Sequence, residues 1–152
     1  MLEITRGTTF RSTSTKRTYK VRQKINCESK NVVYLVSCRK HQFQGIGQTM
    51  DMKKRVSNYW NHHKAKYKAC GITEHFLEDG HVIEEDFIFQ PIVKLANIAN
   101  ISRYQRQLTI RQRLEEFELY WQYLLMTIEP HGMNKREEIE KARKKINKRR
   151  KL

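Results

Sequence analysis

The sequence predicts an α+β fold in which a small, three-stranded, mainly antiparallel sheet is flanked by helices. Two apolar runs, at residues 32–36 and 43–47, are separated by a polar turn, and a third run occupies residues 86–95. Apolar residues recur with helical spacing after the second run and again in residues 101–128. The length of 152 residues suits one domain of ordinary size.

Each predicted strand has its own signal. The run VVYLV is continuous, β-branched and aromatic, which is typical of a strand buried on both faces. The letters CRKHQ predict a turn, and the run after it is short enough to be an antiparallel partner, with Gly45 and Gly47 allowing close approach or a bulge. In the third run, Pro91 predicts an edge position or a bulge, because proline has no N–H to donate to a neighbouring strand.

Helical periodicity defines the remaining elements. One predicted helix has Asp51 at its start and buries a face formed by Met52, Val56, Tyr59 and Trp60. Residues 71–81 predict mostly turn or a short helix, and the segment from residue 135 onward is helix-prone. A long helix is predicted over residues 101–128 and ends before Pro130. Its broad apolar stripe consists of Leu108, Leu114, Phe117, Tyr120, Trp121 and Leu124.

The net charge of +15 requires a partner of opposite charge, and nucleic acid is the foremost class. Residues 1–24 predict an extended basic arm and residues 135–152 a basic tail, which leaves residues 25–134 as the central domain. The tail is typical of a phosphate-binding segment or a nuclear localisation signal, and a simply solvated charge run is the alternative. Because no apolar run could span a bilayer and no signal-peptide pattern is present, we expect a soluble, intracellular protein without a membrane partner.

Several short motifs occur in a recognisable order. They are VVY at residues 32–34, GIG at residues 45–47, Arg55, Tyr59, Glu118 within ELYW and Asn134 within PHGMN. In this order and spacing the chain resembles the GIY-YIG nuclease family. Together with NVVYLVSC, EHF…GH and DFIFQ, the motifs most closely resemble the endonuclease domain of Penelope-like retroelements. The resemblance spans roughly residues 20–134, and the ordered set carries it, because no single motif is specific.

The resemblance implies a metal-dependent endonuclease that nicks DNA in the nucleus and primes a linked reverse transcriptase. Glu118 would bind Mg²⁺ or Mn²⁺, and Arg55 would clamp the scissile phosphate with its planar guanidinium. Tyr34 would be the general base, its phenol pKa lowered by nearby cationic charge. Tyr59 would hydrogen-bond the nucleophile or the phosphate, and Asn134 would hold the substrate or its surroundings. Whether two copies form a dimer for double-strand cleavage stays open.

The second motif departs from the family pattern, because Gly45 stands where the family has a tyrosine. If this glycine is a lesion, Gly45→Tyr should raise nicking; otherwise Tyr59, or a water in the vacated space, would meet part of the missing role. One alternative is a protein of the same fold that binds DNA without cutting it, and another is a basic RNA- or ribosome-associated protein. In the latter Tyr34 would simply be a core tyrosine. Glu118 is harder to explain by packing, because an unpaired carboxylate on an apolar helix face is costly.

A second metal site is predicted from cysteine and histidine spacing. Cys38 and His41 are spaced as C-x₂-H in the turn between the first two strands, and His75 and His81 follow as H-x₅-H. Zinc takes such sulfur and nitrogen ligands tetrahedrally, and the resemblance implies a structural zinc that joins the turn to the later segment. Exposed polar turn residues are the alternative. Cys70 is a rival ligand and Cys27 a weaker one, and we expect His62 and His63 to face phosphate or solvent.

Overall fold

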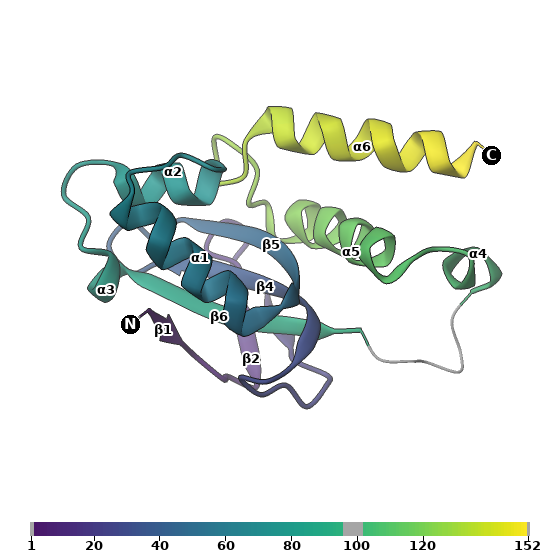
Figure 1. Cartoon of the computed structure of the whole chain (residues 1–152), viewed down its shortest axis with the longest axis horizontal. Helices are drawn as coiled ribbons and strands as arrows, with labels where there is room; N and C mark the ends of the chain where they lie inside the picture. The colour runs from purple at the N-terminus through teal and green to yellow at the C-terminus, as the bar shows by residue number, and fades with distance from the viewer. Residues whose placement is uncertain (1, 96–101, 152) are drawn as a thin grey trace.

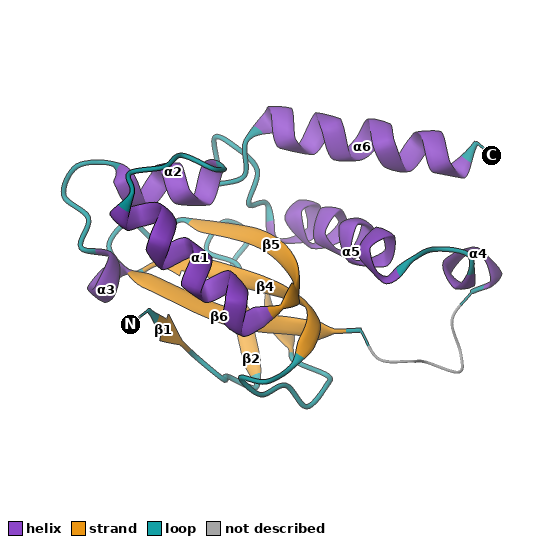
Figure 2. Cartoon of the chain, in the orientation of Figure 1, coloured by secondary structure: helices purple, strands orange, loops and turns teal. Residues whose placement is uncertain are grey.

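The computed structural model describes residues 2–95 and 102–151 and shows a four-stranded mixed sheet, a separate two-stranded sheet and surrounding helices (Figures 1 and 2). The strands are β1 (Glu3–Ile4), β2 (Thr9–Arg11), β3 (Thr18–Lys20), β4 (Lys30–Cys38), β5 (Gln44–Asp51) and β6 (Phe87–Lys94). The helices are α1 (Met52–Lys64), α2 (Gly71–Leu77), α3 (Ile83–Asp86), α4 (Arg103–Arg106), α5 (Ile110–Leu125) and α6 (Arg136–Arg150). The α+β class is therefore confirmed.

The sheet is larger than the sequence predicts. Its order is β1-β6-β4-β5, so the three predicted strands form an antiparallel group with β4 in the centre, and β1 adds a fourth strand parallel to β6. The prediction of three strands is wrong at this edge, because β1 is only two residues long and leaves no periodic signal. Opposite Pro91 the register shifts between Val33 and Tyr34, so the predicted bulge is present.

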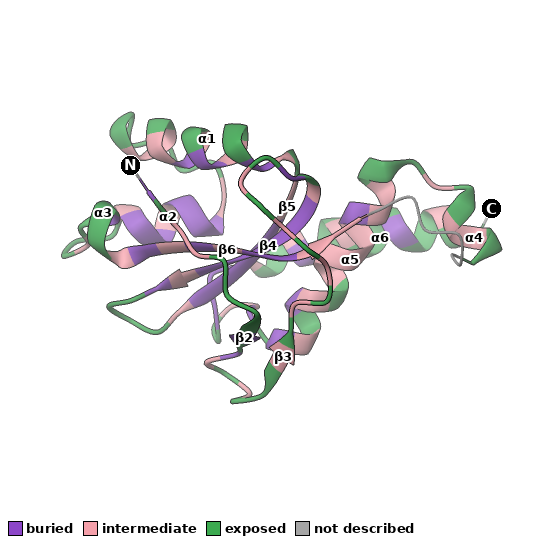
Figure 3. Cartoon of the chain, turned by 90° about the horizontal axis from the view of Figure 1, so that it is seen from below, coloured by how far each residue is buried: buried purple, intermediate pink, exposed green. Residues whose placement is uncertain are grey.

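One face of the sheet is covered by α1, as Figures 1 and 3 show. The helix begins at the predicted acid, because the Asp51 side chain accepts the Lys54 N–H as an N-cap. It buries Met52, Val56 and Tyr59 against the sheet. The helix follows β5 directly and brings Tyr59 against Tyr34 of β4, where the first predicted motif lies.

The opposite face is covered by the β2–β3 pair and α5, which lie across the sheet from α1 (Figure 3). Leu114 and Leu125 of α5 pack with Val33 and Leu35 of β4 in a second core cluster. Both faces of β4 are thus buried, as its uninterrupted apolar run predicts.

The first residues of the chain belong to the folded body rather than to an extended arm. Leu2 and Phe10 are each 4% exposed. The Ser12 hydroxyl donates to the Leu125 carbonyl at 2.7 Å, and the Thr13 N–H donates to Gln44 Oε1 at 2.9 Å. These contacts join positions far apart in sequence, so local patterns could not predict them.

The long helix expected over residues 101–128 is two helices, α4 and α5; residue 101 lies outside the described residues. The break follows from a capping box, in which Thr109 Oγ1 accepts the Gln112 N–H and the Gln112 side chain accepts the Thr109 N–H. The helix ends earlier than expected because Met126 adopts a left-handed conformation. Among the described residues no helix is long and apolar enough to cross a membrane.

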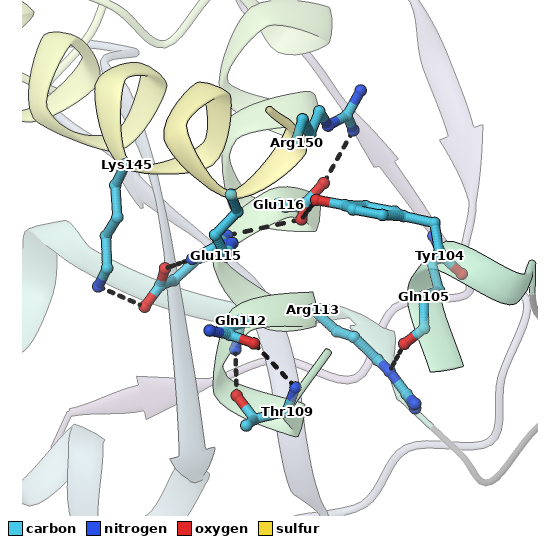
Figure 4. A network of polar contacts seen from close by, with 10 residues as sticks. Tyr104, Gln105, Thr109, Gln112, Arg113, Glu115, Glu116, Lys145 and Arg150 are labelled. Atoms are coloured by element: carbon cyan, nitrogen blue, oxygen red, sulfur yellow. Dashed lines mark hydrogen bonds and ion pairs between the residues drawn. The ribbon is translucent and has the colours of Figure 1, made fainter. Parts of the chain in front are cut away.

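The helix-prone tail forms α6, which an ionic network fastens to α5 (Figure 4). Lys145 and Arg149 each lie 3.0 Å from Glu115, while Arg150 lies 2.8 Å from Glu116. The side chains of Glu115, Glu116 and Arg149 are only 13–16% exposed. Part of the positive charge of the basic tail is therefore paired with acids of α5.

Candidate functional site

Two tyrosine hydroxyls and one guanidinium meet on the α1 face of the sheet. Tyr34 Oη lies 2.6 Å from Tyr59 Oη, and Arg55 Nε donates to Tyr34 Oη at 2.9 Å. The Arg55 Cζ also lies 5.1 Å from the centroid of the Tyr59 ring. Because Arg55 and Tyr59 are four residues apart on α1, they share one side of the helix above β4. The structure thus brings together three of the predicted site residues.

Burial and the positive charge of Arg55 shift the pKa values of the two tyrosines in opposite directions. Tyr34 is 0% exposed and Tyr59 3% exposed. Burial raises the pKa of Tyr34, and Arg55 offsets this only in part; burial also raises the pKa of Tyr59 well above its usual value. The expected lowering of the Tyr34 pKa by cationic charge is therefore wrong, because desolvation is the larger effect. For Arg55, burial is outweighed by the two tyrosines, so its pKa is raised and the guanidinium stays charged.

The two glycines of the second motif have different roles. Tyr34 is paired with Gly47, and a Cβ at position 47 would collide with the Tyr34 hydroxyl and ring. Gly47 therefore makes room for the tyrosine. A Cβ at Gly45 would lie 2.7 Å from Ile72 Cγ1 and 3.1 Å from Met133 Cβ. Ile72 and Met133 therefore crowd the position where the first side-chain atom of a restored tyrosine would lie.

Glu118 lies on α5 as a half-buried carboxylate. Burial raises the pKa of this carboxyl to about 8. The positive charge of Arg55 is the strongest influence that lowers it, and a hydrogen bond from the backbone amide of Gln48 also lowers it. A desolvated carboxylate that interacts with a permanently charged guanidinium is typical of functional sites. A divalent cation would compensate the charge that burial penalises, so the oxygen donors of Glu118 fit a hard metal ion.

The structure adds Glu138 on α6, which the sequence patterns do not single out. Its Oε1 accepts the Gly71 N–H at 2.8 Å, and burial raises its pKa. Its charge also raises the pKa of Glu118, so a second carboxylate acts on the candidate metal ligand. Glu137 and Glu138 both lie in the first turn of α6, where helix dipoles favour acids in general. The sequence therefore holds no signal that would distinguish Glu138 from its neighbour.

Asn134 holds backbone rather than lying in the hydroxyl cluster. Its Oδ1 accepts the Ile46 N–H at 2.9 Å and the Thr127 hydroxyl at 2.6 Å, and its Nδ2 donates to the Ile46 carbonyl at 3.0 Å. The residue is 3% exposed. With its amide buried and used on β5, Asn134 fixes the peptide between the two glycines. Of the two expected roles, this geometry fits a hold on the surroundings of the site and not a direct hold on substrate.

Four potential metal ligands converge at the other end of β4. They are Cys38, His41, His75 and His81, whose ligand atoms all lie within 4.8 Å of one another. The Nε2 atoms of His75 and His81 are 3.2 Å apart. Two nitrogens bound to one tetrahedral zinc would be separated by about 3.3 Å, given bonds of about 2.0 Å. The group that the spacing predicts is therefore assembled and could hold a metal ion.

The protonation of this cluster is consistent with metal binding by nitrogen. Burial, His81 and His41 lower the pKa of His75 to about 4, so this imidazole is neutral near pH 7 and can act as a ligand. Burial raises the pKa of the Cys38 thiol. A thiolate at this position therefore needs a cation beside it, and a bound metal would supply one.

The other candidate ligands lie outside this group. Cys70 precedes α2, and its Sγ is 3.8 Å from the Thr73 hydroxyl. Cys27 is a half-buried free thiol. His62 and His63 are both half-buried on α1, and His63 Nδ1 is buried without a hydrogen-bond partner among the described residues. The rival ligand set with Cys70 is thus not the one the structure assembles.

Comparison of the chain with protein-family models, with curated proteins and with solved structures gives no match in any of the three. A functional interpretation therefore depends on the residues and the geometry of the two candidate sites.

Proposed function

We propose that the protein is a divalent-metal-dependent DNA endonuclease that nicks one strand at a site formed by Tyr34, Arg55, Tyr59 and Glu118. The observation that supports it most is the cluster in which Arg55 Nε donates to Tyr34 Oη at 2.9 Å and Tyr34 Oη lies 2.6 Å from Tyr59 Oη. Burial raises the pKa of the Glu118 carboxyl to about 8, and the charge of Arg55 acts against that rise. The resemblance to the GIY-YIG nucleases and the net charge of +15 point to the same reaction and partner.

Each residue of the proposed site would have a separate role in cleavage. Arg55 uses Nε on Tyr34, which leaves its remaining N–H groups for a phosphate. Mg²⁺ or Mn²⁺ bound at Glu118 would supply positive charge for the phosphoryl group and the leaving 3′ oxygen. Because Tyr34 and Tyr59 share a hydrogen bond inside the core, they orient Arg55 directly. Because burial keeps Tyr34 a neutral phenol, its hydroxyl positions Arg55 and does not accept a proton from the attacking water.

We assign the Cys38/His41/His75/His81 cluster to a structural zinc. Four protein ligands complete a tetrahedral ion and leave no position open for substrate. The ion would tie the β4–β5 turn to α2 and the loop that follows it. It would thus hold β4, which carries Tyr34, against the elements around it.

The wider setting is proposed from the resemblance alone. A nuclease of this kind would act in the nucleus, and the 3′ end at its nick would prime a linked reverse transcriptase. A single site cuts one strand at a time, so a double-strand break would need two copies. Nuclear import driven by the basic residues of α6 can be tested by fusing the chain to a fluorescent protein and neutralising those residues.

Nicking of supercoiled plasmid tests the enzymatic proposal. The native chain should convert supercoiled to open-circular DNA in Mg²⁺ or Mn²⁺ and should stop in chelator. Glu118→Gln should abolish nicking because it removes the metal-binding charge. Glu84→Gln is a matched control, because Glu84 is exposed and forms no ion pair within the described residues. Unchanged nicking by the Glu118 variant would reject the proposed site.

A DNA-binding protein without nuclease activity is the second candidate. The burial of Tyr34 and the crowding beside Gly45 favour it, because both restrict the access of a phosphate to the hydroxyls. Such a protein would bind DNA in a salt-dependent manner in chelator and leave the plasmid supercoiled in every metal. Nicking that depends on Glu118 would exclude this candidate.

A further inference from the structure

Two neighbouring cavities share Phe117 and Tyr120 on the outer side of α5. One cavity, of about 340 Å³, lies between α5 and the segment at β3, with Tyr19 and Trp121 among its lining residues. The other, of about 210 Å³, lies between α5 and the ends of α4 and α6. Tyr120 is 57% exposed, so an aromatic ring stands between two hollows with much of its surface in solvent.

A chain of aromatic contacts supports the Tyr120 ring. The centroid of the Trp121 ring lies 5.4 Å from that of Tyr120, in an edge-to-face arrangement. Trp121 in turn contacts Tyr19 at 5.4 Å and Phe10 at 5.3 Å, which fixes it against the hairpin. The surface near Tyr120 therefore includes aromatic residues that are already ordered, which reduces the entropy cost of binding a flat ligand.

Positive charge borders both cavities. Lys20 and Arg22 line the larger one, and neither forms an ion pair with a described residue. Arg113 and Arg150 line the smaller one, together with a single acid, Glu116. That acid is already paired with Arg150 at 2.8 Å. The rim is therefore cationic on both sides of the exposed aromatic ring.

From this arrangement we infer that the outer face of α5 binds an unpaired segment of DNA, with bases stacking on Tyr120 and phosphates held by Lys20, Arg22 and Arg113. Aromatic rings interleaved with cations are the features by which proteins hold single strands. Bases within a duplex have no free faces, so a stacking platform selects unpaired ones. Two cavities on either side of one ring suit consecutive nucleotides better than a free nucleotide.

This inference deepens the proposed function and rests on it for the choice of DNA. Glu118 and Tyr120 are two residues apart on α5, so their side chains leave the helix about 200° apart. One side of the helix carries the candidate metal ligand and the other carries the stacking ring. A nuclease with this helix would act on DNA that has an unpaired strand next to the duplex, such as a flap, a bubble or a nicked end.

Fluorescence anisotropy in chelator tests binding apart from cleavage. Labelled dT₁₅ and a labelled 15-base-pair duplex are titrated with the full chain and with Tyr120→Ala, Tyr120→Phe and Tyr123→Ala. Tyr123 is a matched control, because it is 44% exposed on the same helix and lines neither cavity. Losing one base–aromatic stack should weaken dT₁₅ binding of Tyr120→Ala roughly tenfold or more, and duplex binding less than about twofold. Tyr120→Phe and Tyr123→Ala should bind dT₁₅ like the native chain.

The outcomes separate this inference from the proposed nuclease. Equal dT₁₅ affinities for Tyr120→Ala and Tyr123→Ala would overturn the inference, and so would an equal loss on the duplex. Tighter, Tyr120-dependent binding of rU₁₅ would overturn the assignment to DNA. If the native chain fails to nick plasmid but the Tyr120 effect on dT₁₅ binding is retained, the nuclease proposal is removed and the strand-binding face stays in place.

Discussion

Replacing Glu118 by glutamine should make the metal-free protein more stable at alkaline pH and leave its stability nearly unchanged at acidic pH. The carboxyl group has an ordinary pKa near 4.5, and burial raises it to about 8 in the folded state. Between these values the folded protein binds more protons than the unfolded chain, so this group's contribution to stability falls as pH rises. Glutamine resembles the neutral acid in shape and does not titrate.

The size of the effect follows from the pKa difference. Each pH unit between the two pKa values is worth about 1.36 kcal/mol, which gives an upper value of about 5 kcal/mol for Glu118. The side chain is half-buried, and solvent that reaches it lowers the penalty. We therefore expect the free energy of unfolding of Glu118→Gln to exceed that of the native chain by about 3 kcal/mol at pH 8.5, and by less than about 0.5 kcal/mol at pH 4.5.

Urea unfolding followed by tryptophan fluorescence measures this difference at the two pH values in chelator. Titrations of all other groups cancel, because the two proteins are compared at the same pH. Glu84→Gln should show no gap at either pH, since Glu84 is exposed. A difference in the free energy of unfolding that has the same size at both pH values would indicate a packing effect and would refute the raised pKa of Glu118. Added Mg²⁺ should stabilise the native chain at pH 8.5 and leave Glu118→Gln unaffected.

Three further predictions follow from the site geometry. Gly47→Ala should lower the free energy of unfolding by about 1–3 kcal/mol and reduce nicking, because its methyl group would displace the Tyr34 hydroxyl; urea unfolding and the plasmid assay check both. Gly45→Tyr should destabilise the protein rather than raise nicking, because Ile72 crowds the position of the new Cβ, and a higher nicking rate would contradict this. Cys38→Ser should lower bound zinc below one ion per chain in elemental analysis and lower Tm, whereas the native chain should lose the same Tm increment on treatment with a zinc chelator.

The local patterns of the sequence predicted the centre of the fold well. The apolar run of β4 and the periodic face of α1 depend on neighbours in the chain, and both elements form where expected. The Cys38/His41 pair lies in a turn closed by the Cys38 N–H to Phe43 carbonyl bond, so its geometry is also local. Elements of this kind can be predicted, because one stretch of chain contains both the signal and the structure that it produces.

Most of the features that the sequence did not predict depend on contacts between distant parts of the chain. Strands β1 and β2 are two and three residues long, and they form because Leu2 and Phe10 reach core positions set by distant parts of the chain. Glu138 approaches the site of Glu118 only through the packing of α6 and α2. The break before α5 was different, because the capping box at Thr109 was present in the sequence but lay within a longer apolar periodicity.

The packing of α6 limits what can be concluded from deleting the basic tail. In its ion pairs with Glu115 and Glu116, Arg149 and both acids are only 13–16% exposed, so the Arg149 pairs are shielded from solvent more than ordinary surface pairs. Ile139 and Ile146 are also buried, at 4% and 6% exposure. Removing α6 would leave two acids unpaired, uncover apolar surface and take Glu138 from the site. Loss of DNA binding or nicking in a truncated chain would therefore not identify a phosphate-binding tail. Single substitutions of the outward-facing lysines separate the two effects, because they change the charge and leave the helix packed.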